Sequence, residues 1–128
     1  DFTSVVIKYS KTMEKEIYLF MKELFKILIK NSKEVFAAKY PDAKIVHCVV
    51  PQKEWIMTAI KEGSKITGYR KYVYCYLLAK DGTDGYINAR FLFLEYRDAG
   101  ENYVKSASWP KWDRTDIVPN SVYSKLAE

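Results

Sequence analysis

His47, the only histidine of the chain, is the residue best suited to acid/base chemistry, because an imidazole titrates near neutral pH. It lies in the apolar run KIVHCVV, where alternation places it on one strand face with Ile45 and Val49. It would gain a catalytic role if a carboxylate such as Glu95 approached it. A lone histidine on an apolar strand is more often a core residue with one satisfied hydrogen bond, and we favour that interpretation.

The catalytic alternative requires a pocket between a helix and a sheet, as in a small-molecule-binding protein or an enzyme. Its lining would include His47, Glu95, Phe25, Phe91 and Phe93.

The sequence contains no motif for a metal site or for a catalytic nucleophile. Cys48 and Cys75 lack the CxxC and Cys/His spacings that hold zinc, and the acidic loop at residues 81–84 has the composition of a turn. No GxSxG and no phosphate loop is present. We therefore expect no metal and no cofactor, and a non-catalytic role over an enzymatic one.

The two cysteines both lie in apolar runs, IVHCVV and YVYCYLL. This placement favours buried free thiols. The alternative is a cross-strand disulfide, which would indicate an oxidising compartment.

Aromatic residues are unusually frequent in this sequence, at 16%, and 11 of them are tyrosines. Tyrosine has an apolar body and a polar tip, so an excess favours sheets and interfaces. The candidate interaction residues are Tyr72, Tyr74, Tyr76, Arg90, Tyr96, Tyr103, Trp109 and Trp112. The last two, with Tyr103, are either partner anchors or residues that hold the C-terminal segment to the body.

Basic residues beside these tyrosines permit a second interpretation, in which the run binds nucleic acid. Arg70 and Lys71 precede Tyr72, and together with Tyr74 and Tyr76 they could form a stacking platform for single-stranded nucleic acid. The run lacks the glycine and aromatic spacing of RNA-recognition strands, and the net charge of +5 is moderate. A protein interface is the favoured interpretation.

The elements that must position these residues begin with a helix at residues 13–40. Apolar side chains at helical spacing fill an arc of about 200° there, and lysines form a stripe opposite. A strand follows at residues 44–50. Residues 51–62 fit a short helix better than a strand, although the alternation at Glu54, Ile56, Thr58 and Ile60 permits either. Residues 2–9 fit an edge strand or the lead-in to the helix.

Residues 66–109 have the pattern of an antiparallel meander, with strands at 69–80, 86–97 and 103–109 and turns at 81–85 and 98–102. The run 109–112, which contains Pro110, is expected to end the sheet. Both faces of the meander are apolar, so the helix covers one face, and the C-terminal segment, a second chain or a ligand covers the other.

The length of 128 residues predicts one α+β domain at residues 1–112, with a tail at 113–128 that packs on the body or is partly disordered. No apolar run is long enough to span a membrane. Because the chain begins at Asp1 rather than Met, we expect that a leader, an anchor or a preceding domain has been removed, as in an extracytoplasmic domain.

A long helix followed by a curved antiparallel sheet resembles the cystatin-like/NTF2-like class, in which the helix lies in the concave face of the sheet. The resemblance is one of topology, and no functional residue is carried over from it. The class includes small-molecule enzymes, dimerising adaptors and the VirB8-like assembly domains of bacterial conjugation and secretion machines. We expect a non-catalytic assembly or adaptor domain that forms a homo-oligomer or binds a protein partner.

Overall fold

The computed structural model describes residues 14–52, 54–82 and 85–119, with side chains from residue 23 onward. It is an α+β fold, and its helix α2 spans Glu14–Lys39. The strands are β1 (Lys44–Val49), β2 (Ile56–Glu62), β3 (Lys65–Asp81), β4 (Gly85–Asp98), β5 (Val104–Lys105) and β6 (Lys111–Pro119). The predicted helix, the strand at residues 44–50 and the two long strands of the meander are confirmed.

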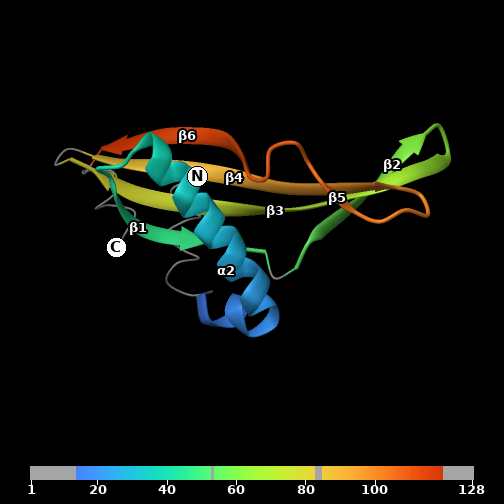
Figure 1. Ribbon diagram of the computed structural model, residues 1–128, viewed down its shortest axis with the longest axis horizontal. Coiled ribbons are helices and arrows are strands. Elements are labelled where there is room, and N and C mark those ends of the chain that lie inside the picture. The colour runs from blue at the N-terminus through green and yellow to red at the C-terminus, as the bar shows by residue number, and fades with distance from the viewer. Residues whose placement is uncertain (1–13, 53, 83–84, 120–128) are drawn as a thin grey trace.

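All six strands form one antiparallel sheet built on the long pair β3 and β4 (Figure 1). β1 and β2 both pair with the outer edge of β3, one after the other along its length. β6 and β5 share the outer edge of β4 in the same way. The sheet is therefore four strands wide but much longer than one domain core requires.

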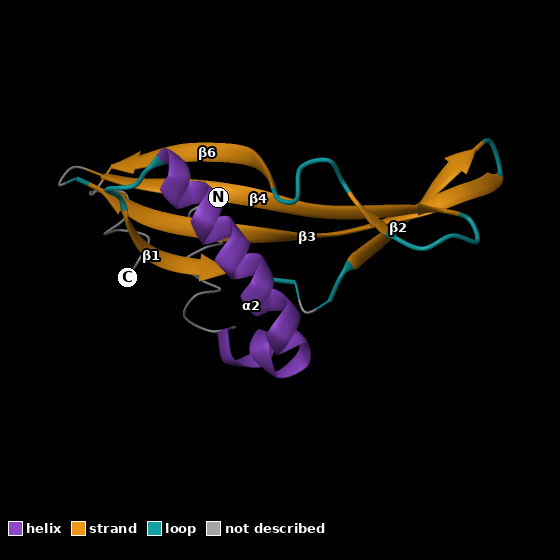
Figure 2. Cartoon of the chain, in the orientation of Figure 1, coloured by secondary structure: helices purple, strands orange, loops and turns teal. Residues whose placement is uncertain are grey.

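α2 crosses only one half of this sheet, over β1, β3 and β4 (Figure 2). Phe25, Leu28 and Phe36 of the helix are fully buried, and the inward residues of β3 and β4 facing them are buried too. The inward residues of these strands are Val73, Cys75, Leu77, Ala79, Ile87, Ala89, Phe91 and Phe93. Beyond the helix, β2 and β5 and the parts of β3 and β4 paired with them project as an extension, which we call the arm (Figure 1).

The helix expected within residues 51–62 is wrong, because β2 occupies Ile56–Glu62 as a strand. Apolar residues at 56, 57, 59 and 60 suit either element, and the long β3 provides a pairing edge that local propensity does not show. Gly63, at a φ of 61°, makes the tight turn into β3.

The end of the meander also differs from expectation. The strand expected at 103–109 is only Val104–Lys105, and the sheet does not end at 109–112 but continues as β6. Pro110 stands just before the first residue of β6, where its missing N–H is not needed by the ladder. Residues 113–119 belong to β6, whereas 120–128 and the run at 2–9 lie outside the described residues.

Three bulges set which side chains share a face. In β1 the register shifts between Ile45 and His47, and in β6 Asp113 is the extra residue between Trp112 and Arg114. Near the turn of β2 and β3 a third shift leaves Thr67 unpaired, and its hydroxyl donates to the carbonyl of Ile60 at 3.3 Å. Each bulge moves the following residues to the opposite face from the one that simple alternation predicts.

No helix in the part of the chain that the structure describes is long and apolar enough to cross a membrane.

Candidate functional site

Alternation along β3 places Tyr72, Tyr74 and Tyr76 in one row on the sheet face away from α2, as predicted. The rings of Tyr72 and Tyr74 meet edge to face at 5.7 Å between centroids, and those of Tyr74 and Tyr76 lie 6.3 Å apart. All three side chains are half-buried. We call this side of the sheet the tyrosine face; β4 contributes Arg90, Leu92, Leu94 and Tyr96 to it through direct cross-strand pairing.

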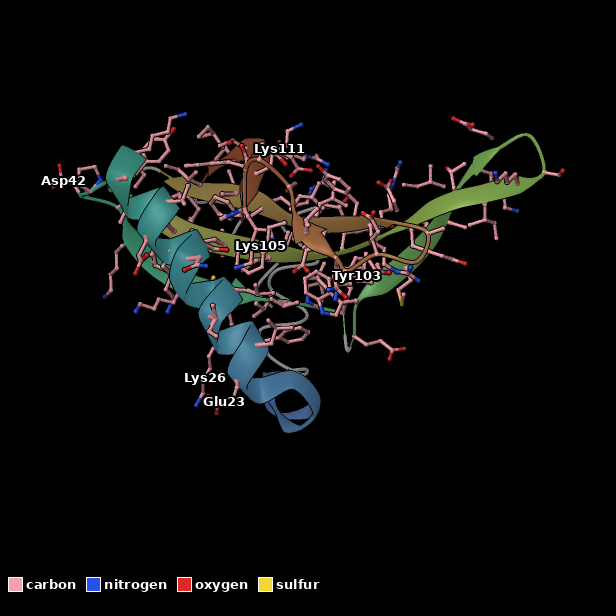
Figure 3. All side chains as sticks on the ribbon, turned by 45° about the vertical axis from the view of Figure 1, so that its right-hand side comes forward. Glu23, Lys26, Asp42, Tyr103, Lys105 and Lys111 are labelled. Carbon is pink, nitrogen blue, oxygen red and sulfur yellow. The ribbon has the colours of Figure 1, made fainter. Side chains whose placement is uncertain are left out.

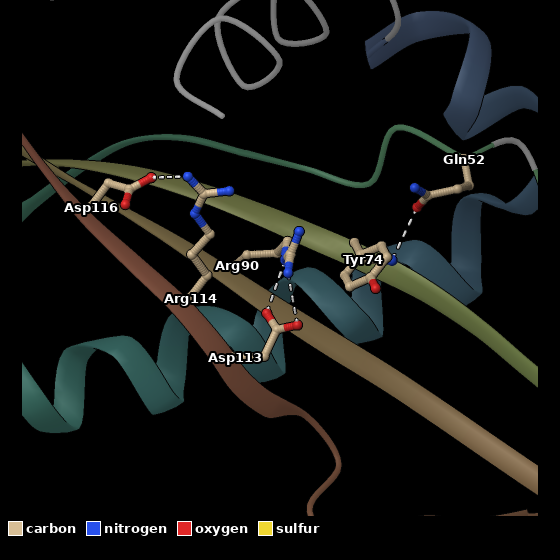
Figure 4. A network of polar contacts seen from close by, with 6 residues as sticks. All are labelled: Gln52, Tyr74, Arg90, Asp113, Arg114 and Asp116. Atoms are coloured by element: carbon tan, nitrogen blue, oxygen red, sulfur yellow. Dashed lines mark hydrogen bonds and ion pairs between the residues drawn. The ribbon is translucent and has the colours of Figure 1, made fainter. Parts of the chain in front are cut away.

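Arg90 is the centre of a polar network on this face (Figure 4). Its guanidinium lies over the Tyr74 ring at 4.7 Å and donates to both carboxylate oxygens of Asp113, from Nε at 3.0 Å and from Nη2 at 3.1 Å. The hydrogen bond to Asp113 raises the pKa of Arg90, and burial raises the pKa of Tyr74. Arg90 therefore stays charged and Tyr74 stays neutral at physiological pH.

The β6 bulge places Arg114 as well as Asp113 on the tyrosine face. In a regular strand, Trp112 and Arg114 would share one face. With the bulge, Trp112 points to the helix side while Arg114 lies opposite Arg90 on the tyrosine face. Arg114 in turn pairs with Asp116 at 3.1 Å. Asp113 is not a predicted site residue, because the sequence predicts a sheet that ends at residues 109–112, whereas β6 continues to Pro119.

Gln52 completes the network at the edge of β3. Its side-chain oxygen accepts the backbone N–H of Tyr74 at 3.0 Å, in the gap where β1 has ended and β2 has not begun. The amide thus substitutes for a strand at that position and fixes the backbone beneath the tyrosine row.

Large apolar side chains continue the tyrosine face into the arm, where they are exposed. Cross-strand pairing places Ile56 opposite Tyr72, and Val104 opposite Tyr96. Their exposed fractions are 37% for Ile56, 46% for Tyr96 and 51% for Val104. At the other end of this face Leu78 and Asn88 are fully buried. The open part therefore runs from Tyr76 to the tip of the arm.

The other three predicted interaction residues lie on the opposite side of the sheet, facing α2. The Trp109 ring meets Phe93 edge to face at 4.9 Å. Trp112 packs on Phe91 at 5.1 Å and on Phe36 at 5.6 Å, so it joins β6 to the helix. Tyr103 lies beside Lys71 on the same side. These three residues do not form one surface with the tyrosine row.

The expected acid/base pair is not brought together. Because of the β1 bulge, His47 lies opposite Leu78 on the tyrosine face and no longer shares a face with Ile45, which is opposite Ala79. Glu95 pairs with Lys71, seven residues away along β3 and on the helix side.

The other expected pocket residues, Phe25, Phe91 and Phe93, are fully buried in the core beneath α2. An open depression of about 350 Å³ lies elsewhere, at the end of the β3–β4 hairpin, lined in part by Asp81, Tyr86 and Ile117.

The nucleic-acid platform is divided between the two faces. Arg70 lies on the tyrosine face, but Lys71 points to the helix side, where its ammonium lies over Trp55 and Tyr103. A continuous basic and aromatic surface along this run is therefore not formed.

Both cysteines are free thiols, as favoured from the sequence, and their Sγ atoms lie 3.4 Å apart between β1 and β3. The hydrogen bond to Cys75, with burial, raises the pKa of Cys48. Across the described ranges, no cluster of three His, Cys, Asp or Glu side chains could hold a metal ion.

The chain matches no protein-family model, no curated protein and no solved structure.

Proposed function

We propose that this chain is a non-catalytic assembly domain whose tyrosine face binds protein, and that the first occupant of this face is a second copy of the chain. One observation carries the proposal: Ile56, Tyr96 and Val104 are exposed on the same face as the tyrosine row. Contiguous exposed apolar side chains of this kind mark interaction surfaces on soluble domains.

The size of the face is suitable for a dimer. From Lys65 to Tyr76 β3 has ten paired steps of about 3.4 Å, since the bulge residue Thr67 adds none, and four strands at about 4.8 Å give a width of about 19 Å. The projected area is on the order of 650 Å², close to the roughly 800 Å² that each partner buries in a standard interface.

The charges of the face favour a second copy over a strongly charged partner. Arg90 pairs with Asp113 and Arg114 with Asp116. Cations and carboxylates are also close to balance among the other charged residues of the open part of the face, which are Lys65, Arg70, Lys111, Glu62 and Asp98. A two-fold interface brings the same patch of both subunits together and therefore requires self-complementary charge. A patch with a net charge of one sign would repel its own copy.

The architecture that we propose for this domain is cystatin-like/NTF2-like, supported by a long helix lying across one face of an antiparallel sheet. Within the class that the topology resembles, the role corresponds to the VirB8-like assembly domains. A larger bacterial cell-envelope complex is the setting that we propose.

Measurement of mass in solution tests the proposal, since the chain has a mass of 15.0 kDa and a dimer would have twice that mass. Ile56→Lys and Tyr74→Glu should each convert the dimer to a monomer with unchanged helix content by circular dichroism. Met57→Lys is the matched control, because Met57 is 59% exposed on the same strand but faces the opposite side. A chain that is monomeric at high concentration, or a dimer that Ile56→Lys leaves intact, would refute it.

A further inference from the structure

The helix side of the arm carries a second cluster, built from Lys71, Glu95, Lys105, Arg97, Tyr103 and Trp55. The register sets its rows: Lys71 of β3 lies opposite Glu95 of β4, and Glu95 lies opposite Lys105 of β5. Arg97 is opposite Tyr69 in the next row of the same face. Figure 3 labels Tyr103 and Lys105, which lie beside and within β5. We call these six residues the cation–aromatic cluster.

Each cation of the cluster lies over aromatic rings. The Lys71 ammonium is 4.9 Å from the centre of the Trp55 ring and 4.4 Å from that of Tyr103. The Arg97 guanidinium is 5.4 Å from the same Tyr103 ring. These contacts hold the cations in place and remove part of their hydration, which lowers the cost of binding a counter-ion there.

Two further cation and ring contacts extend the arrangement. Arg97 also lies 4.4 Å from the Tyr69 ring, and Lys105 lies 4.1 Å from the ring of Trp109. The rings are thus covered by the protein's own cations. A stacked nucleobase would have to displace a cation, so the cluster favours a compact ligand.

The charges of the cluster do not balance. Three cations share a single carboxylate, and the Lys71 Nζ is 3.9 Å from the Glu95 Oε1, at the long limit of an ion pair. Only 23% of the Lys71 side chain and 15% of the Glu95 side chain reach solvent, so water compensates the excess positive charge incompletely.

Hydrogen-bond donors are in excess as well. The Oη of Tyr103 and the Nε1 of Trp109 are buried and have no hydrogen-bond partner among the residues that the structure describes. Unsatisfied buried donors are rare in folded proteins. A group that brings negative charge and several acceptor oxygens would satisfy both the charge and these donors.

We infer that the cation–aromatic cluster is a binding site for an oxyanion, a phosphate or carboxylate group, held by Lys71, Arg97 and Lys105. This site lies on the side of the sheet opposite the tyrosine face and does not depend on dimer formation. The oxyanion would belong to a free small molecule or to a ligand that carries such a group.

The indole N–H signals of the three tryptophans report on this site directly by nuclear magnetic resonance. Inorganic phosphate is titrated at constant ionic strength, with chloride as the replaced anion, so that general screening is held fixed. The Trp55 and Trp109 signals should shift and saturate below about 10 mM phosphate. The Trp112 signal should stay in place, because that ring packs beneath α2. Acetate in a parallel titration separates a carboxylate preference from a phosphate preference.

Arg97→Gln and Lys105→Gln should each weaken the response at least about 10-fold, because each removes a charge-assisted contact. Arg114→Gln is the control, since it removes an equal charge from the tyrosine face. The dispersion of the spectrum shows whether each variant folds. Absence of any saturable shift with both anions would overturn the site, as would shifts that persist unchanged in both cluster variants.

Discussion

Breaking the pair of Arg90 and Asp113 should lower the free energy of unfolding through a measurable coupling between these two residues. The pair has two nearly parallel hydrogen bonds of 3.0 and 3.1 Å, and 27% of the Arg90 side chain and 16% of the Asp113 side chain are exposed. It is therefore neither a solvated surface pair nor a fully buried one.

The magnitude of the coupling between Arg90 and Asp113 lies between the values for an exposed ion pair and for a buried, charged hydrogen bond. An exposed ion pair contributes about 0–1 kcal/mol, whereas a hydrogen bond to a charged group contributes about 1.5–3 kcal/mol. Partial exposure of both side chains places the coupling at about 1.5–2 kcal/mol. Loss of the Arg90 contact with the Tyr74 ring adds about 0.5–1 kcal/mol to the Arg90 variant alone. Arg90→Met should therefore cost more than Asp113→Asn.

A double-mutant cycle with Arg90→Met, Asp113→Asn and the double variant isolates the coupling, measured by urea unfolding at one protein concentration. The cycle is best done in the Ile56→Lys background, because dimerisation would otherwise add a concentration-dependent term. A coupling below about 0.5 kcal/mol would show that the bidentate geometry contributes little beyond a surface pair, contrary to our reasoning.

Two other predictions concern the body of the sheet. Because the pKa of Cys48 is raised by its hydrogen bond to Cys75 and by burial, its contribution to the free energy of unfolding is complete below its usual pKa of 9.0 and is lost as pH rises above that value. Unfolding curves from pH 7 to 10.5 should show a steeper loss in the wild type than in Cys48→Ala, and equal slopes would count against it. Gly68→Ala should lower the free energy of unfolding by more than about 2 kcal/mol, since an added Cβ would collide with the backbone carbonyl of Arg97 on the paired strand; an unchanged urea midpoint would contradict this.

Hydrophobic periodicity was sufficient to predict the elements that bury one continuous stripe of apolar side chains. The helix is predicted at 13–40 and observed at Glu14–Lys39, because its apolar spacing persists over seven turns. The tyrosine row was predictable for the same reason, since strict alternation in β3 holds from Tyr72 to Tyr76. Both predictions depend only on the repeat of one element.

Features that depend on a partner strand were not predictable in this way. The segment 51–62 forms β2 because β3 extends far enough to pair with it, and no local pattern records the length of another strand. Tyr103, Trp109 and Trp112 lie in or next to the irregular stretch between β4 and β6, where no period assigns a face. Their placement on the helix side follows from packing against Phe93, Phe91 and Phe36.

The β6 bulge depends both on the alternation of its own strand and on pairing with β4. The coupling of Arg90 and Asp113 is informative for this reason. One extra residue lets a single strand place Trp112 in the core and both Asp113 and Arg114 on the tyrosine face. If the ion pair contributes the expected coupling, it stabilises the bulge as well as the face, because a regular strand that kept Trp112 in the core would turn Arg114 to the helix side. Deleting Asp113 should then leave Trp112 opposite Phe91 and Arg114 opposite Arg90, because simple alternation is restored, and the indole emission should match that of Asp113→Asn. Quenched, solvent-exposed indole emission in the deletion variant alone would contradict this, and would mean that the bulge is needed to hold β6 in register.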